Sequence, residues 1–419
     1  MKNIFLTTTL IGLSVAGYAQ QTKLPKPFET KSVRNYSNVI GWPKGKTPTA
    51  PKGFKVSLYA NNLHNARNMY VAANGDIFAA QANTEMSGIK KIGATIIGAT
   101  KSQNLDEGAN NILLFQDTNG DGIADTKRIF LKNLTQPYGM LVLGYWFYVA
   151  NTDGLYRYPY KLGQTQVSGA GKKILSLPAG GYNNHWTRNL LANAAGTKIY
   201  IAVGSGTNIG EKGMEHEVRR AAILEINPGG SGEKIYASGL RNPVGIDLQP
   251  GTGTLFTAVN ERDGLGDNLV PDYLTSVKPG GFYGWPYSYF GQNLDPRVKE
   301  EKPDLVKRSI IPDVALGAHT ASLGLTFYKK GNFPQRYQNG AFIGQHGSWN
   351  RSTLSGYKVV FVPFTNGKPG KPEDFLTGFM ANLTKGEVYG RPVGVAVTKD
   401  GSLLVADDAS NCIWRVSVN

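Results

Sequence analysis

Residues 243–260, PVGIDLQPGTGTLFTAVN, and residues 392–408, PVGVAVTKDGSLLVADD, repeat one short pattern. Each stretch holds a small apolar strand, a glycine turn, and a second apolar strand that ends in polar residues. The pattern returns along the chain at residues 68–80, 137–151, 189–204, 243–260, 323–347 and 392–408. Strand–turn–strand units repeated at long intervals are typical of β-propellers. The sequence therefore predicts an all-β fold, a six-bladed β-propeller.

The last repeat is incomplete, because residues 412–418 supply only a third strand before the chain stops. An uncovered edge strand is prone to aggregation, so a fourth strand is expected from elsewhere. Residues 54–60, FKVSLYA, alternate apolar and polar side chains and directly precede the first repeat. We therefore expect residues 54–60 to pair with residues 412–418 and to close the ring, which assigns residues 51–419 to the propeller.

Residues 1–19 contain Lys2, an apolar run and small residues before Gln20, a pattern typical of a cleaved secretory signal. This predicts export of the Gram-negative bacterial type, with a periplasmic or secreted protein as the product. Residues 20–50 are expected to form an N-terminal extension outside the ring. No other long apolar stretch follows, which argues against stable membrane insertion. Cys412 is the only cysteine, so an intrachain disulfide is excluded.

The chain has 45 Lys and Arg against 30 Asp and Glu, a formal net charge of +15. In an exported protein this charge favours acidic small molecules or anionic surfaces, although it equally serves solubility. The basic residues are spread along the chain without a block, which argues against nucleic acid as a partner.

Propeller topology places the residues before each first strand, and after each second strand, on one face. Those nearest the axis line the mouth of the central channel, the usual ligand site. The residues expected there include Arg67, Gln136, His185, Arg188, Arg241, Asn242, Asp263, His319, His346, Arg391 and Asp408.

Guanidinium groups that converge on one small mouth repel one another unless they are paired. They suit a planar polyanion, because arginine binds carboxylates through two parallel hydrogen bonds. The alternative is that they cap backbone carbonyls and pair with neighbouring acids. A neutral histidine at the mouth can accept a proton in catalysis, whereas the alternative is an ordinary hydrogen-bonded loop residue.

Residues 117–125, DTNGDGIAD, place Asp117, Asn119, Asp121 and Asp125 at calcium-loop spacing, on a hairpin tip away from the mouth. Arg128 stands where the last carboxylate of such a loop is expected. Two readings stay open here, a structural calcium site and a metal-free Asp-Gly hairpin. Residues 260–267, NERDGLGD, offer further oxygen donors of the kind that Ca²⁺ prefers.

Several stretches around the expected mouth resemble one known family. They are NHWTRNL (184–190), GLRNPVGI (239–246), NERDGLGDNLVPD (260–272), VKPGGFYGWP (277–286), GQHGSWNR (344–351), GRPVGVAV (390–397) and GSLLVADD (401–408). Together they resemble the soluble glucose/sorbosone dehydrogenases that use pyrroloquinoline quinone (PQQ), above all the L-sorbosone dehydrogenase-like branch. The family's fold is a six-bladed propeller, in agreement with the repeat count.

The resemblance also implies residue roles. His185 matches the family's catalytic base, and Arg241 with Asn242 matches the pair that contacts the quinone and its carboxylates. Arg391 matches an arginine over the cofactor, and Gln136 falls near a substrate-side glutamine.

The metal site is implied in the same way. The Asp263–Gly264 turn falls where backbone carbonyls hold the Ca²⁺ that bridges to PQQ, and Asp272 matches a carboxylate that supports this loop.

Two positions depart from the family's glucose-oxidising members. Those members have a lysine near the quinone where this chain has Gln345-His346-Gly347, and an arginine where it has Tyr389. We therefore expect His346 and His319 to take over some cofactor contacts, with Arg188 as a further contact.

The resemblance implies a PQQ- and calcium-dependent oxidation of a sugar or a related aldehyde or polyol, by hydride transfer to the quinone. His185 is expected to take the hydroxyl proton with a pKa near neutral. The electron acceptor is not identified by the sequence, and a cytochrome and a quinone are its candidate classes. The alternatives are a non-catalytic carbohydrate- or protein-binding propeller and a calcium-dependent lactonase-type hydrolase, against which the arginine-rich mouth argues.

Overall fold

The structure is a computed structural model that describes residues 23–85, 95, 99–102, 108–167, 169–329 and 331–419. The predicted signal at residues 1–19 lies outside the described residues. Within the described part, no helix has the length and apolar character that crossing a bilayer requires.

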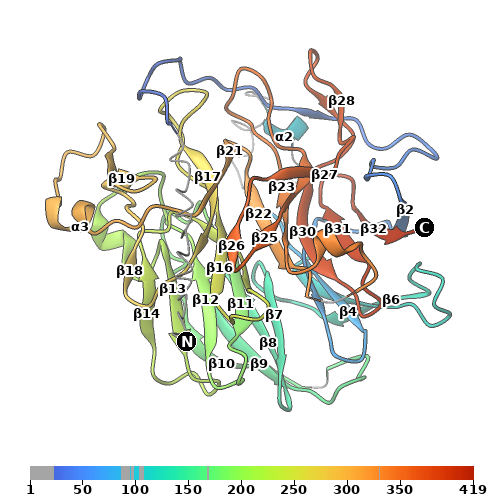
Figure 1. Cartoon of the computed structure of the whole chain (residues 1–419). Helices are drawn as coiled ribbons and strands as arrows, with labels where there is room; N and C mark the ends of the chain where they lie inside the picture. The colour runs from blue at the N-terminus through green and yellow to red at the C-terminus, as the bar shows by residue number, and fades with distance from the viewer. Residues whose placement is uncertain (1–22, 86–94, 96–98, 103–107, 168, 330) are drawn as a thin grey trace, which may run out of the picture.

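Short strands dominate the described chain and form six larger sheets in order along the sequence (Figure 1). The first sheet contains β3 (Ala66–Val71), β4 (Ile77–Gln81), β5 (Asn111–Gln116) and β6 (Thr126–Leu131). The second contains β7 (Gly139–Leu143), β8 (Trp146–Asn151), β9 (Gly154–Pro159) and β10 (Lys172–Ser176). The third contains β11 (Arg188–Ala192), β12 (Ile199–Val203), β13 (Ala222–Ile226), β14 (Lys234–Ser238) and the short β18 (Gly281–Phe282).

The remaining sheets follow the same order. The fourth contains β15 (Pro243–Leu248), β16 (Leu255–Val259), β17 (Pro271–Ser276) and β21 (Val314–Ala318). The fifth contains β22 (Ser322–Phe327), β23 (Ala341–Gln345), β24 (Lys358–Val362) and β27 (Glu373–Leu376). The sixth contains β30 (Pro392–Val397), β31 (Leu403–Asp407), β32 (Cys412–Val418) and β2 (Phe54–Ala60).

Smaller elements decorate these sheets. The short strands are β1 (Asn38–Val39), β19 (Ser288–Tyr289), β20 (Asn293–Leu294), β25 (Phe364–Thr365), β26 (Lys368–Pro369), β28 (Met380–Asn382) and β29 (Glu387–Val388). The helical turns are α2 (Ala99–Ser102), α3 (Pro303–Lys307) and the 3-10 turns η1 (Met214–Glu217) and η2 (Gln335–Tyr337).

The first strands of the six sheets contact one another in sequence, from β3 through β7, β11, β15 and β22 to β30, and β30 contacts β3. The described sheets therefore have the propeller-like, all-β arrangement that the repeats predict. The glycine of the PVG motif makes the close approach possible. A Cβ on Gly245 would lie 2.6 Å from the backbone nitrogen of Leu325, and one on Gly394 would lie 2.6 Å from the backbone oxygen of Arg67.

The second strand of most sheets is buried along its whole length. β12 (IYIAV), β16 (LFTAV) and β31 (LLVAD) have no exposed residue, because sheets cover them on both faces. Apolar clusters fill the spaces between sheets, and one of them joins β31 and β32 to the side chains of β2. This burial explains why the repeats appear as continuous apolar runs in the sequence.

The predicted pairing of residues 54–60 with residues 412–418 is confirmed. Strand β2 runs antiparallel to β32 with Phe54 opposite Val418, Val56 opposite Val416, and Ala60 opposite Ile413. The last sheet thus draws its outer strand from the N-terminal part of the chain.

Residues 23–50, here called the N-terminal strap, dock on the sheets. β1 pairs in parallel with β29. Trp42 Nε1 donates a 2.8 Å hydrogen bond to the buried Asp407 carboxylate, and the Tyr36 ring stacks on Trp349 at 5.6 Å between centroids. Figure 1 shows this blue segment across the same end of the molecule as α2. The strap therefore covers part of one face of the sheets.

The β2–β32 pairing can be tested by a double-mutant cycle on Val56→Ala and Val416→Ala. Because these side chains lie opposite each other, we expect a coupling energy of about 0.5 kcal/mol in urea unfolding. The control pair, Val56→Ala with Val244→Ala on β15, should be additive. A cycle without coupling between Val56 and Val416 would contradict the observed register.

Candidate active site

His185 lies in the loop before β11 and is held in one tautomer. Its Nδ1 is 2.8 Å from the carbonyl oxygen of Ser205 and 3.0 Å from the Ser205 hydroxyl. The Ser205 hydroxyl itself donates to the carbonyl of Thr207. Because a carbonyl can only accept, Nδ1 carries the proton and Nε2 is an unprotonated acceptor.

Burial, reinforced by the nearby Arg241 charge, lowers the pKa of His185 to about 3. The expectation of a near-neutral pKa for this residue is therefore wrong. The physical reason is that both the low-dielectric surroundings and the guanidinium disfavour the imidazolium. His185 is neutral throughout the physiological pH range.

Gly204 separates His185 from Asn242. A Cβ on Gly204 would collide with Asn242 Oδ1 and would lie 2.5 Å from His185 Cβ. Within the described residues, Asn242 Oδ1 is buried and accepts no hydrogen bond. The structure thus brings the predicted base together with a buried acceptor that lacks a donor.

Arg241 is buried and its hydrogen-bonding capacity is used by the protein. It donates to the carbonyls of Asn208, Asn260 and Glu261 and to Asn208 Oδ1, and it lies 3.4 Å from the Asp263 carboxylate. A guanidinium has five N–H donors, and all five are engaged here. The predicted alternative, capping of backbone carbonyls, therefore describes Arg241 in this structure.

Arg188 also serves its own loop. It donates to the carbonyls of His185, Thr187 and Pro178 and to Asn183 Oδ1. The prediction that Arg188 contacts the cofactor does not agree with this geometry. The buried guanidinium binds the loop that carries His185. Arg188 positions His185.

Arg391 and His346 belong to the other half of the mouth. Arg391 donates to the carbonyls of His346 and Gly347 at 2.9 Å and to the carbonyl and hydroxyl of Ser102 at 2.8 and 3.0 Å. His346 Nε2 lies 2.7 Å from Asp408. Burial and the Arg391 charge lower the pKa of His346 to about 4, so this imidazole is neutral as well.

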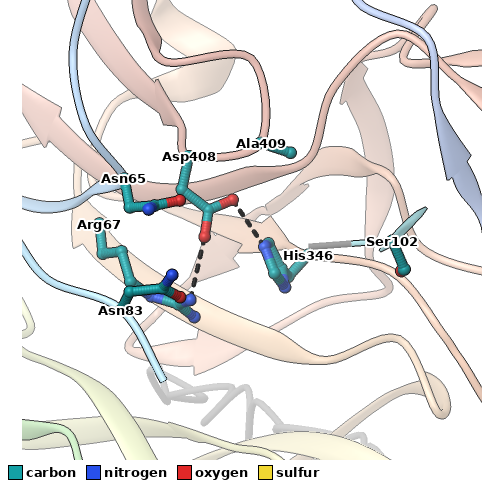
Figure 2. Close-up of a pocket in the computed structure, with 7 residues that line it drawn as sticks. All are labelled: Asn65, Arg67, Asn83, Ser102, His346, Asp408 and Ala409. Atoms are coloured by element: carbon teal, nitrogen blue, oxygen red, sulfur yellow. Dashed lines mark hydrogen bonds and ion pairs between the residues drawn. The ribbon is translucent and has the colours of Figure 1, made fainter. Parts of the chain in front are cut away.

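Asp408 lies between His346 and Arg67, and the ion pair to Arg67 measures 3.0 Å (Figure 2). These side chains line a small cavity together with residues of α2 and of the loops beside the first and last sheets. The lining residues are Asn65, Arg67, Asn83, Ser102, His346, Asp408 and Ala409. Gln136 donates from Nε2 to the carbonyl of Asn83 at 2.9 Å and is itself buried. The predicted substrate-side glutamine therefore supports the cavity wall.

His319 completes the first half of the site. Its Nε2 lies 2.9 Å from the carbonyl of Gly266, and its Nδ1 lies 3.5 Å from Asp263 and 3.1 Å from the Asn350 amide. Although burial opposes the charged form, the Asp263 carboxylate raises the pKa of His319.

The two halves are joined by the backbone after β21. The amide of His346 donates to the carbonyl of Ala321, and the amide of Gly347 donates to the carbonyl of Thr320. His185 is linked to Arg241 through Ser205, whose amide donates to the Arg241 carbonyl. From Arg241 the network of contacts continues through Asp263 and His319 to His346 and Arg391.

The donor set at the predicted calcium turn does not fit the metal. The carbonyl oxygen of Asp263 accepts from Arg297 Nη1 at 2.5 Å and from Asn208 Nδ2 at 3.1 Å, so both lone pairs are used. Gly264 lies directly against Arg297 Nη1. The described residues also contain no group of three or more His, Cys, Asp or Glu arranged to hold a metal ion.

Asp272 supports this loop, as the resemblance implies for it. Its buried carboxylate accepts from the amides of Glu261 and Ser322 at 2.9 and 2.8 Å and from the Thr320 hydroxyl at 2.9 Å. Burial raises the pKa of Asp272 to about 6 in spite of these donors.

The loop at residues 117–125 joins β5 to β6, on the predicted hairpin tip. Asp117 accepts from the amides of Gly120 and Gly122, and Asp125 accepts from Thr118 and Asn119. The Asn119 amide group donates to Asp121 and Asp125. In this structure the loop is a hairpin closed by its own hydrogen bonds, with both the Asn119 amide nitrogen and its oxygen engaged within the loop.

Some residues of the site were missed from the sequence. Ser102 comes from the insertion between β4 and β5, and Arg297 comes from the irregular chain between β17 and β21. Neither stretch carries the repeat pattern that located the other residues. Trp186 follows His185 directly, and its indole lies 5.5 Å from the Arg67 guanidinium.

A protein-family model described as TrAA12-like matches residues 48–280 and 294–419. An uncharacterised protein of Borreliella burgdorferi is 28% identical over 388 residues, which cover 88% of this chain and 90% of that protein. The Trichoderma reesei carbohydrate-active enzyme of family AA12 has a similar structure, with a TM-score of 0.71 and 18% identity over 92% of this chain and 100% of that one. The PQQ domain of Coprinopsis cinerea pyranose dehydrogenase, in its holo form, gives a TM-score of 0.69 and 18% identity over 91% and 100% of the two chains. At these identities, the structural likenesses establish a shared fold.

Gly204→Ala tests the packing of the site. The new methyl group would displace Asn242 and His185. We therefore expect a large loss of enzymatic activity in the cofactor-bound protein, although the sheets should still fold. Gly180→Ala is the matched control, because a Cβ there meets no atom within 4 Å. Full activity in Gly204→Ala, measured by steady-state kinetics and circular dichroism, would show that these two residues are not needed where they lie.

Proposed function

Because the chain belongs to the TrAA12-like family, we propose that it is a PQQ-dependent oxidoreductase acting at the mouth of a closed six-bladed ring. Its substrate is a sugar or a related aldehyde or polyol, of the sorbosone or aldose type. The main support for this proposal is the neutral His185. Its Nδ1 carries the proton and donates a hydrogen bond to the Ser205 carbonyl, so Nε2 is free to accept a proton. The proposal includes export, as residues 1–19 predict, and transfer of electrons to a separate acceptor.

The charge of the site supports an anionic cofactor such as PQQ. Within the described residues, the buried guanidiniums of Arg188 and Arg391 have carbonyl, hydroxyl and amide oxygens as partners, and neither forms an ion pair. Arg67 Nε is buried and has no hydrogen-bond partner among those residues. The unpaired charges of Arg188 and Arg391 favour a polyanion, whereas the charge of Arg67 is paired with Asp408 and only its Nε is free to donate. Arg67 and Arg391 would hold the polyanion with Asn242 as a further polar contact, whereas Arg241, whose five N–H donors bind the protein, would contribute its charge alone.

When bound, PQQ supplies the two-electron acceptor. The protein supplies a base in a fixed tautomer, and His185 accepts the hydroxyl proton at Nε2. Arg241 lowers the pKa of this base in the free protein, so a bound polyanion that offsets the Arg241 charge raises it. Because the Asp263 turn does not fit calcium, the proposal assigns no step to a metal ion.

Reconstitution tests the proposal. The purified protein is titrated with PQQ while its absorbance is followed, and dye reduction is then measured with aldoses, sorbosone and simple alcohols. We expect saturable PQQ binding and dye reduction with at least one sugar. Sugar binding without PQQ binding or dye reduction would overturn the proposal in favour of a carbohydrate-binding propeller.

His185→Ala should lower kcat by about 10²–10⁴-fold, because the proton acceptor is lost. PQQ binding should persist, since His185 is neutral and contributes no charge to an anionic ligand. His216→Ala is the control, because His216 is exposed and pairs only with Glu215 at the surface. Loss of PQQ binding in a folded His185→Ala variant would instead assign His185 to the cofactor.

The pKa of His185 gives a second test. An imidazole is unprotonated above its pKa, so NMR titration of the cofactor-free protein should show neutral His185 from pH 8 down to pH 5, and PQQ should move the midpoint upward. His319 serves as internal contrast, because the neighbouring Asp263 raises its pKa against the effect of burial. A His185 midpoint near 6.5 without PQQ would contradict the argument that burial and the Arg241 charge lower its pKa.

A further inference from the structure

The turn at Asp263–Gly264 already holds a cation from the protein itself. Arg297 Nη1 donates to the carbonyl oxygen of Asp263 at 2.5 Å, beside the Asn208 amide at 3.1 Å. A carbonyl oxygen has two lone pairs, and these two donors use both. A metal ion could bind this oxygen only after displacing one of them.

The Arg297 guanidinium is held by Asp295 on the side away from the Asp263 carbonyl. Asp295 accepts from Arg297 Nε at 2.9 Å and from Nη2 at 2.7 Å, a bidentate pair. The Asp295 side chain is fully buried and also lies 3.4 Å from Arg262. Although burial opposes ionisation, Arg297 and Arg262 lower the pKa of Asp295, so the carboxylate stays charged.

The turn is shaped to this guanidinium. Gly264 has φ of 92°, a conformation that favours glycine, and a Cβ there would lie 2.6 Å from Arg297 Nη1. The Asp263 carboxylate is engaged as well, by Asn350 at 2.7 Å, Arg241 at 3.4 Å and His319 at 3.5 Å. A metal ion at Asp263 would have to displace Arg297 or Asn208 from the carbonyl oxygen, whereas the carboxylate, whose side chain is 29% exposed, keeps accepting capacity.

We propose that Arg297 is the resident cation of the Asp263–Gly264 turn, and that the turn therefore needs no calcium. Arg297 acts as a positioning residue, because it fixes the loop whose Asp263 contacts Arg241 and His319. A guanidinium is charged at every physiological pH, so this support depends on neither acidity nor metal supply. The inference concerns the loop and does not depend on which cofactor or substrate binds.

The test compares the melting temperature of each variant in EDTA and in CaCl₂. All variants also carry Asp121→Asn, which weakens the loop at residues 117–125 as a competing calcium site. With Arg297 intact, the two melting temperatures should be equal, and calorimetric titration with CaCl₂ should give no binding heat. Arg297→Ala should lower the melting temperature by roughly 3–10 °C, because it leaves Asp295 buried with less of its charge paired. It also frees the Asp263 carbonyl, so calcium should now raise the melting temperature.

Arg308→Ala, at an exposed position, is the control and should change neither the melting temperature nor the calcium response. Calcium binding by the Arg297-intact protein would overturn the proposal, and this outcome can be read even if Arg297→Ala does not fold. An Arg297→Ala variant as stable as its parent would overturn it too. PQQ binding measured in EDTA and again in CaCl₂ separates the two ideas. Its absence under both conditions would count against the proposed function alone, whereas binding only in CaCl₂ would count against the calcium-free turn.

Discussion

The buried carboxylate of Asp272 holds together the two loops on which the candidate site depends. It accepts from the Glu261 amide at the start of one loop, and from Thr320 and Ser322 in the other. A buried carboxylate without hydrogen-bond donors would lower the stability of the fold. The three donors therefore stabilise the Asp272 charge, and the carboxylate in turn holds the two loops in place. Through these bonds Asp263 and His319 come to face each other, and Arg241 gains its acidic neighbour.

Arginine is used at this end of the molecule largely to give irregular backbone its partners. Three arginines donate to carbonyl groups of loops, which no strand pairs. Arg188 binds Pro178 within its own loop, whereas Arg241 binds Glu261 and Arg391 binds Ser102 in other loops. Such contacts reduce the freedom of the loops before a ligand arrives. A base that is already oriented, with a defined tautomer, costs no reorganisation at the moment of reaction.

The sequence predicts the sheets well because burial leaves a regular trace. The second strands are apolar runs, the PVG glycines recur where inner strands touch, and strand β2 alternates as a half-covered outer strand should. The same regularity located the loops that carry His185, Arg241 and Arg391. It could not show which partners their side chains choose, since that depends on the paths of several loops at once.

The features that the sequence left open or misjudged all depend on competition between partners. The calcium spacing of residues 117–125 is present, but the amides of the same loop take the carboxylates. The Asp263 carbonyl is placed as expected, but Arg297 reaches it from a stretch without any repeat. The basicity of His185 depends on burial and on Arg241, and neither can be measured from residue identities alone.

The pairing of β2 with β32 also sets an order of events in the life of the molecule. Strand β2 is made early on the ribosome, whereas its partner β32 is the last of the described strands and is made much later. Until then β2 has no neighbour in its own sheet. The N-terminal strap also lacks Asp407, the acceptor of its Trp42 hydrogen bond. Completion of the final sheet is a contact of very high sequence separation, which is intrinsically slow to form. A chain that lacks β32 therefore leaves β2 unpaired, and a chain that lacks β2 leaves β32 as an open edge, so each strand protects the other.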